Sequence, residues 1–193
     1  YDRLVKVAKG AAMMTETELE IEFLGGCYNR LCNMELSKVL YDCLAEAPKE
    51  AFTQEEKDFA HALNQTMPEL YEQLRTKAYA PEGTDLHEGL LPIEPVDGYG
   101  SSDVGDVQHI VPGGSFSTAC FAIGAPGHSW QNSACSGHSL GLRGMIYASR
   151  VIALFGLKVI ENPDIVEKAK AEFVKETGGK PYICPIPEEL PIP

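Results

Sequence analysis

The strongest constraint on the fold is an alternation of apolar and acidic side chains over residues 17–24. Leu19, Ile21 and Phe23 would face one way along an extended chain, and the glutamates between them would face the other. Successive side chains of a β-strand point to opposite faces of the sheet. The alternation therefore predicts a strand with one buried and one solvated face, ended by a pair of glycines.

A second strand is predicted over residues 117–124, a short apolar run that ends in Gly124. The other periodic segments have apolar residues spaced three and four apart, which is typical of helices. Helices are expected at 2–14, 34–46, from Thr53 past Leu63, 68–78, 138–157 and from Asn162 to Gly178. Helices that alternate with strands predict an α/β fold with a sheet that is small for its helices.

The predicted helix starts carry recognisable capping residues. Asn33 can cap one helix, and Thr53 with Glu56 forms a capping box for the next. Asp2 is a plausible cap for the first helix, and His138 is better explained as a helix-start residue than as a metal ligand. In the longest helix, the stripe expected to face the core is Leu142, Ile146, Ser149, Ala153 and Leu157.

The net charge of −12 argues against a nucleic-acid partner, because such proteins need clustered lysines and arginines. The apolar runs are short and interrupted, so no membrane-spanning helix is expected. The six cysteines are irregularly spaced, which favours buried free thiols over disulfides and agrees with a cytoplasmic location. The chain begins at Tyr1 in what reads as the middle of a helix, which suggests a fragment.

His128 is the first candidate functional residue, because it follows the predicted strand at 117–124 on a glycine-containing turn. Ligands of open α/β sheets bind at the carboxyl ends of strands, and neutral imidazole is the commonest metal ligand. Gly127 is expected to allow the sharp turn that points the imidazole into a cleft. The residues alone leave open that His128 is a turn histidine without a metal.

A polar stretch at residues 100–109 is the second candidate. Asp103 and Asp106 could bind a cation, although their spacing does not fit a calcium loop, and such residues also stabilise turns. Ser102 and Asp103, with His109 nearby, invite comparison with a nucleophile triad, but no nucleophile elbow is present. Trp130 could wall an aromatic substrate pocket or anchor the core equally well.

These two segments resemble the C-terminal part of the aminoacylase and glutamate-carboxypeptidase superfamily of zinc peptidases. Gly100-Ser-Ser-Asp-Val-Gly-Asp-Val and Pro126-Gly-His-Ser-Trp-Gln look closest to the aminobenzoyl-glutamate utilisation branch. The similarity extends over Gly141-Leu-Arg-Gly-Met-Ile-Tyr-Ala-Ser-Arg-Val and, more loosely, over Lys9-Gly-Ala-Ala-Met-Met-Thr and Gly26-Cys-Tyr-Asn-Arg-Leu. It therefore covers nearly the whole chain.

The resemblance implies an architecture. Members insert a βαββαβ lid into an α/β zinc-binding domain, so residues 1–26 would be a helix and a strand of that lid. Residues 27–193 would then be the C-terminal half of the catalytic domain. Family lids commonly mediate dimers, which makes a homodimer the expected assembly.

The resemblance also implies a chemistry: metal-dependent cleavage of an aminobenzoyl-glutamate-like, N-acyl amino acid or dipeptide amide bond. Two zinc ions, or manganese or cobalt, would serve as cofactors. Only the last of the family's metal ligands matches a residue here, His128, so the fragment alone is expected to be inactive. Ser102, Asp103, Asp106 and Trp130 would line the substrate or support the metal ligands. The alternative is a non-catalytic truncated homologue that acts as a binding or assembly module.

Overall fold

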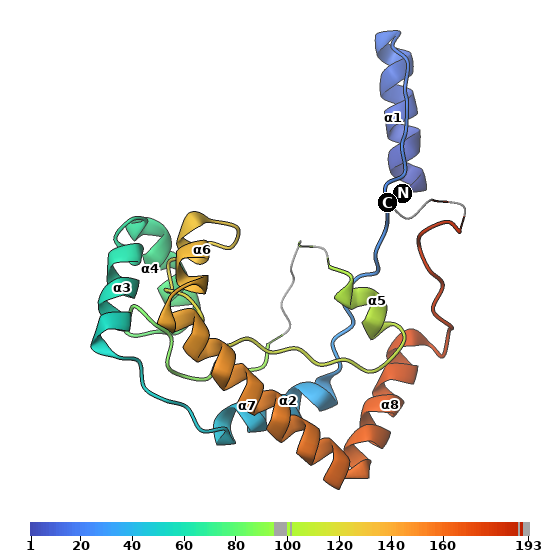
Figure 1. Ribbon diagram of the computed structural model, residues 1–193. Coiled ribbons are helices and arrows are strands. Elements are labelled where there is room, and N and C mark those ends of the chain that lie inside the picture. The colour runs from blue at the N-terminus through green and yellow to red at the C-terminus, as the bar shows by residue number, and fades with distance from the viewer. Residues whose placement is uncertain (95–99, 101, 189, 191–193) are drawn as a thin grey trace.

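The computed structural model describes residues 1–94, 100, 102–188 and 190, and every regular element in them is a helix. Three helices, α2, α6 and α8, pack against a long helix, α7, while α1 projects away from the rest (Figure 1). Their bounds are α1 Asp2–Thr15, α2 Met34–Glu46, α3 Gln54–Asn64, α4 Pro68–Lys77, α5 Val104–Gln108, α6 Trp130–Ser136, α7 Ser139–Glu161 and α8 Pro163–Thr177.

The predicted α/β class is therefore wrong, because the described residues contain no strand and no sheet. Residues 17–24 are extended but pair with no neighbouring backbone among those residues. Leu19 and Ile21 are exposed, and Phe23 contacts only the ring edge of Tyr1, with the ring centroids 5.7 Å apart. Alternating apolar and acidic residues indicate that an extended segment has two different faces. A strand also needs a second segment to hydrogen-bond with, and the alternation does not predict whether one is present.

The second predicted strand, residues 117–124, is also wrong as a strand. Its backbone lies against α7, where a side chain added at Gly144 would collide with Cys120 and with the carbonyl oxygen of Ala119. The hydroxyl of Thr118 donates to the carbonyl oxygen of Gly144 at 3.0 Å. A partly buried apolar run thus packs on a helix instead of joining a sheet, which periodicity alone cannot distinguish.

The helix starts, by contrast, follow the predicted caps closely. The side chain of Asn33 accepts from the Leu36 amide at the start of α2, and Thr53 with Glu56 forms the complete capping box of α3. The Nδ1 atom of His138 accepts from the Leu140 amide, as expected of a helix-start residue. For α1 the cap position is Tyr1 instead of Asp2, without a side-chain bond.

The central helix α7 contacts α2, α6 and α8, but through a different face from the predicted one. Its buried residues are Leu140, Gly144, Tyr147 and Val151. Leu142, Ile146 and Leu157 of the predicted stripe are instead between 47% and 55% exposed. Both faces of α7 are apolar, so the sequence pattern could not tell which one the remaining helices cover.

The packing divides into two clusters along α7. One lies between α2 and α7, and the other joins α3, α6 and the start of α7 to three connecting segments. Near the other end of α2, the buried Asn33 amide donates to the Ala169 carbonyl of α8 at 2.9 Å. The buried members are Leu40, Cys43, Ala47, Tyr147 and Val151 in the first cluster, and Phe52, Ala60, Leu63, Leu86, Ala122, Cys135 and Leu140 in the second.

A fully buried carboxylate, Glu56, ties α3 to α7. It accepts two bonds from Nε of Arg143, at 3.0 and 2.9 Å, and one from the Thr53 amide at 2.8 Å. Burial alone would raise the pKa of Glu56, but the hydrogen bonds from the Thr53 backbone and from Arg143 outweigh it and lower the pKa. The hydrogen bonds from Thr53 and Arg143 thus stabilise the charged form of the buried Glu56 carboxylate.

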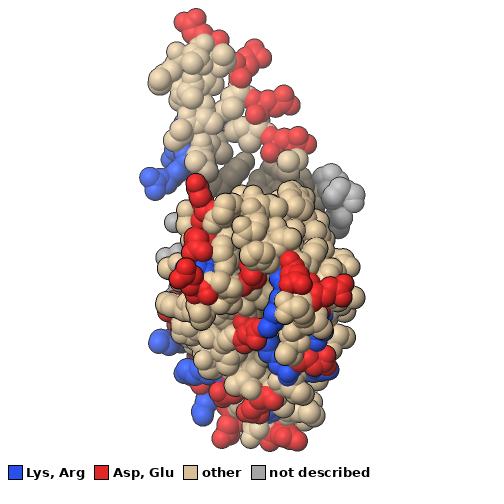
Figure 2. All heavy atoms as spheres, turned by 90° about the vertical axis from the view of Figure 1, so that its left-hand side faces the viewer, with Lys and Arg blue, Asp and Glu red and all other residues tan. Residues whose placement is uncertain are grey.

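The projecting part consists of α1 and the extended segment after it. No residue of α1 is buried. Figure 2 shows acidic side chains in a row along this projection, in agreement with the exposure of the glutamates at 16, 18, 20 and 22. A helix without a buried face gains nothing from tertiary packing.

One helix in the described part of the chain, α7, is long and apolar enough to cross a membrane by length and composition, contrary to the sequence expectation. The core helix of a soluble protein can pass the same test. In α7 two arginines engage carboxylates outside the helix: Arg143 pairs with Glu50 and Glu56, and Arg150 pairs with Glu50. We therefore treat α7 as the packing centre of this fold.

Replacing Glu56 with Gln should lower the free energy of unfolding at pH 7 by about 1–3 kcal/mol, because the Arg143 pair and the capping box both weaken. The folded-state pKa of Glu56 is lowered, so its contribution is present above the ordinary value of 4.5 and fades as pH falls through the folded value. Denaturant titrations from pH 7 to pH 3 should show the two proteins converging. Glu55→Gln, on the exposed side of the same turn, is the charge-matched control. If the free energies of unfolding of the wild type and Glu56→Gln differed by the same amount at every pH, this account would be contradicted.

Candidate functional site

His128 lies on the turn that leads into α6, with an exposed side chain. Its φ angle is 57°, in the left-handed region that non-glycine residues seldom occupy. Gly127 lies in the turn, as expected, but it has no positive φ, and the unusual backbone falls on the histidine itself. Strained backbone of this kind is more frequent at functional sites than elsewhere.

The His128 turn is held from both sides. Before it, the buried Asn64 accepts from the Gly124 amide at 2.8 Å and donates to Asp85 at 2.8 Å. After it, the hydroxyl of Ser129 donates to the Pro126 carbonyl at 2.7 Å and accepts from an amide in the first turn of α6. These hydrogen bonds hold the backbone on both sides of His128, while its ring is open to solvent.

The acidic stretch forms a separate cluster around α5. Asp106 accepts from the Tyr28 amide at 3.2 Å and from the Tyr182 hydroxyl at 2.9 Å, so it joins α5 to two distant segments. Burial first, and then the hydrogen bond to Asp106, raise the pKa of Tyr182 above its usual value. A side chain at Gly105 would collide with the Tyr28 carbonyl, so this close approach requires glycine.

Ser102 and Asp103 lie on the exposed edge of the same cluster. The Ser102 hydroxyl accepts from the Val104 amide at 3.2 Å and lies 3.4 Å from a carboxylate oxygen of Asp103. These contacts are those of a turn before a short helix. The sequence offered His109 only as a possible triad member with Ser102 and Asp103, and the structure places its ring against Tyr28, with the centroids 4.5 Å apart. Its Nε2 atom is buried without a hydrogen-bond partner among the described residues.

The structure does not bring the two predicted segments together. Figure 1 shows α5 and α6 on opposite sides of the molecule. Trp130 begins α6 and is 61% exposed, so the core-anchor interpretation of this residue is wrong. No group of three or more His, Cys, Asp or Glu side chains in the described parts of the chain could hold a metal ion. One exposed imidazole is short of the three or four ligands that a zinc site needs, so these residues do not by themselves fit the expected metal.

The cysteines are free thiols in the structure. Cys43 and Cys135 are buried, and burial raises the pKa of both thiols. Cys27, Cys32 and Cys184 are exposed. Cys43 lies in the packing of α2, and Cys135 lies in that of α6. A raised pKa keeps these thiols protonated, which slows their oxidation because only a thiolate reacts readily.

The strain at His128 can be measured independently of any metal. His128→Gly should be more stable than His128→Ala by roughly 1 kcal/mol, because glycine adopts the left-handed conformation without a steric cost. The same two substitutions at Ser133, an exposed position inside α6, should give the reverse order. Urea unfolding of the four variants tests both statements. Alanine equal to or better than glycine at position 128 would rule out the left-handed turn.

Comparison with known proteins gives one informative match. No protein-family profile matches the chain, and no solved structure matches it. A p-aminobenzoyl-glutamate hydrolase subunit of Escherichia coli (strain K12), the one designated B, is 29% identical to it over 205 aligned positions. The alignment takes in 98% of this chain but only 43% of the length of that relative. The resemblance drawn from the sequence motifs is thereby confirmed: the chain is a relative of this p-aminobenzoyl-glutamate hydrolase subunit, matched along almost all of its own length.

Proposed function

We propose that this chain is part of a hydrolase that cleaves the amide bond of an aminobenzoyl-glutamate or a similar N-acyl amino acid. The observation that carries the proposal is the alignment of 98% of the chain with a relative named for that hydrolysis. The chain spans less than half of that relative, so the proposed activity is that of a longer protein. In such a protein the described residues would supply only part of the site.

His128 is the residue of this chain that we propose as a metal ligand. Its ring is exposed on an anchored turn, which leaves an imidazole nitrogen accessible to a metal. The remaining ligands and the group that activates water would have to come from polypeptide outside these residues. The metal would supply a polarised carbonyl and an activated water, and His128 would hold it in place.

We propose a second, different chain as the partner, because the relative is named as one subunit of a hydrolase. That name gives no support to the homodimer expected from the resemblance. The exposed apolar face of α7 offers surface for contact with further polypeptide. Surface of this kind rarely stays open in a soluble monomer.

The alternative function is a non-catalytic module that binds or assembles with other chains. The wide separation of the His128 turn from α5, and the lack of a ligand cluster in the described residues, favour this alternative over activity of the chain alone. Activity of the longer protein separates the two possibilities.

The 193-residue chain alone should not hydrolyse p-aminobenzoyl-glutamate, with or without added zinc or manganese, because most of the expected ligands are missing. The readout is release of p-aminobenzoate, followed by chromatography, with the longer protein containing this chain assayed in parallel. Turnover by the short chain would refute the incomplete site. Inactivity of the longer protein under all metals tested would instead favour the non-catalytic module.

In that longer protein, His128→Ala should reduce the bound metal, measured by elemental analysis after dialysis, because the loss of an imidazole ligand weakens coordination. His138→Ala is the matched control, since that imidazole caps α7 and lies against Phe59. Unchanged metal content in His128→Ala, at wild-type stability, would remove His128 from the site.

A further inference from the structure

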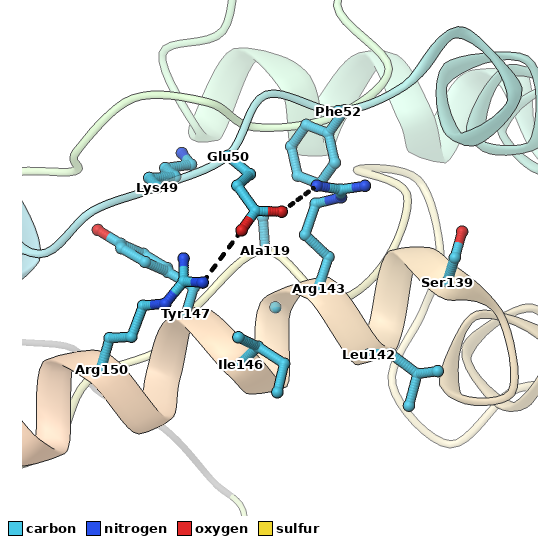
Figure 3. A pocket seen from close by; sticks show the side chains of 11 residues that line it. Lys49, Glu50, Phe52, Ala119, Ser139, Leu142, Arg143, Ile146, Tyr147 and Arg150 are labelled. Carbon is cyan, nitrogen blue, oxygen red and sulfur yellow. Dashed lines mark hydrogen bonds and ion pairs between the residues drawn. The ribbon is translucent and has the colours of Figure 1, made fainter.

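A cavity of about 210 Å³ lies between the segment before α3 and the start of α7 (Figure 3). It does not include His128 or any residue of α5. Its walls are largely apolar, and the principal ones are Phe52, Ala119, Leu142, Ile146 and Tyr147. The volume lies below the usual range of ligand pockets, so it has room only for a small molecule, and apolar walls with few polar groups favour an organic one.

Two arginines on one side of α7 define the polar part of the cavity. Arg143 and Arg150 are seven residues apart, which is two turns of helix, and both point toward the segment above α7 (Figure 3). Arg143 is held by its two bonds to the buried Glu56, and Arg150 by a 3.0 Å bond to the Pro48 carbonyl. Both guanidinium groups are therefore positioned before any ligand arrives.

The side chain of Glu50 occupies the space between the two arginines. One of its oxygens lies 3.1 Å from Arg143 and the other lies 3.0 Å from Arg150. This side chain is 64% exposed and comes from a segment outside any helix. The Arg150 hydrogen bond is the first cause of a lowered pKa at Glu50, so the carboxylate is charged at neutral pH. Exposed ion pairs are weak, and the Glu50 carboxylate can be exchanged for another.

A third cation stands at the rim. The ammonium group of Lys49 lies 5.7 Å from the centre of the Tyr147 ring and donates to the Glu88 carbonyl at 2.7 Å. Burial lowers the pKa of Lys49. Arg143, Arg150 and Lys49 thus face the carboxylates of Glu50 and Glu56, and displacement of Glu50 would leave an excess of positive charge beside an apolar cavity.

We propose that this cavity binds small aromatic carboxylates, whose carboxylate takes the place of Glu50 between Arg143 and Arg150 while the ring enters the apolar space beside Phe52 and Tyr147. Two arginine forks held in fixed positions match the two oxygens of a carboxylate. The apolar walls account for selection of a ring-bearing acid over a small ion such as acetate.

In this scheme Glu50 is an internal competitor that must swing outward into solvent before the ligand binds. The only ion pairs that Glu50 breaks are the exposed ones with Arg143 and Arg150, so the free-energy cost of the exchange is small. An aromatic carboxylate would also be a product of the amide hydrolysis proposed above, and that link alone rests on the proposed function. Binding itself requires no metal, no hydrolysis and no residue outside this chain.

The test is a calorimetric or NMR titration of the 193-residue chain with benzoate and with benzamide, its uncharged equivalent in shape. Benzoate should bind at least about tenfold more tightly, because only the carboxylate gains charge-assisted bonds from both arginines. Glu50→Gln should tighten benzoate binding about two- to fivefold, which corresponds to removal of an exposed ion pair. Arg150→Gln should weaken benzoate binding about tenfold and leave benzamide binding unchanged.

Arg3→Gln on the projecting α1 is the control that removes the same charge far from the cavity, and it should bind like the wild type. Circular dichroism and thermal unfolding establish that each variant is folded. If Arg150→Gln fails to fold, the opposite effect expected of Glu50→Gln still decides the question. Equal binding of benzoate and benzamide, or no benzoate binding to Glu50→Gln, would overturn the proposal.

Discussion

The Glu56 carboxylate is the interaction on which most of the arrangement depends. It closes the capping box of α3 and, in the same position, holds the guanidinium group of Arg143 on α7. A buried charge is tolerated only when its donors are complete, so α3 and α7 must come together in one relative position. Arg143 also donates a hydrogen bond to Glu50. This bond holds the segment between α2 and α3 over α7.

Local signals in the sequence predicted six of the eight helices in the described residues and missed the two shortest, α5 and α6. Capping depends on a few neighbouring residues, and the structure confirms the roles of Asn33, Thr53 with Glu56, and His138. The strands were wrong because a strand depends on a second segment elsewhere in the chain. The covered face of α7 was wrong because that helix is apolar on more than one side, and the neighbours that decide between faces are set by tertiary contacts.

In the candidate site, too, the local structure could be predicted from neighbouring residues, whereas the spatial arrangement of distant segments could not. The turn at 126–129 was recognisable from its residues, but the left-handed backbone at His128 was not expected. The separation of this turn from Asp106 of α5 could not be predicted from the sequence, because the contacts that place both segments come from residues far away in the chain. The two arginines of the cavity gave no recognisable motif. Their partners come from residues about a hundred positions earlier, and only folding places them side by side.

The projection of α1 has a consequence for the dynamics of the chain. A helix of 14 residues without a buried side chain has only its own backbone bonds to stabilise it. Such a helix opens without disturbing the contacts of α2, α7 and α8, so its amide hydrogens exchange with solvent far sooner than those near Val151. The first fifteen residues thus unfold and refold as a separate unit. Contact with another surface would stabilise this helix.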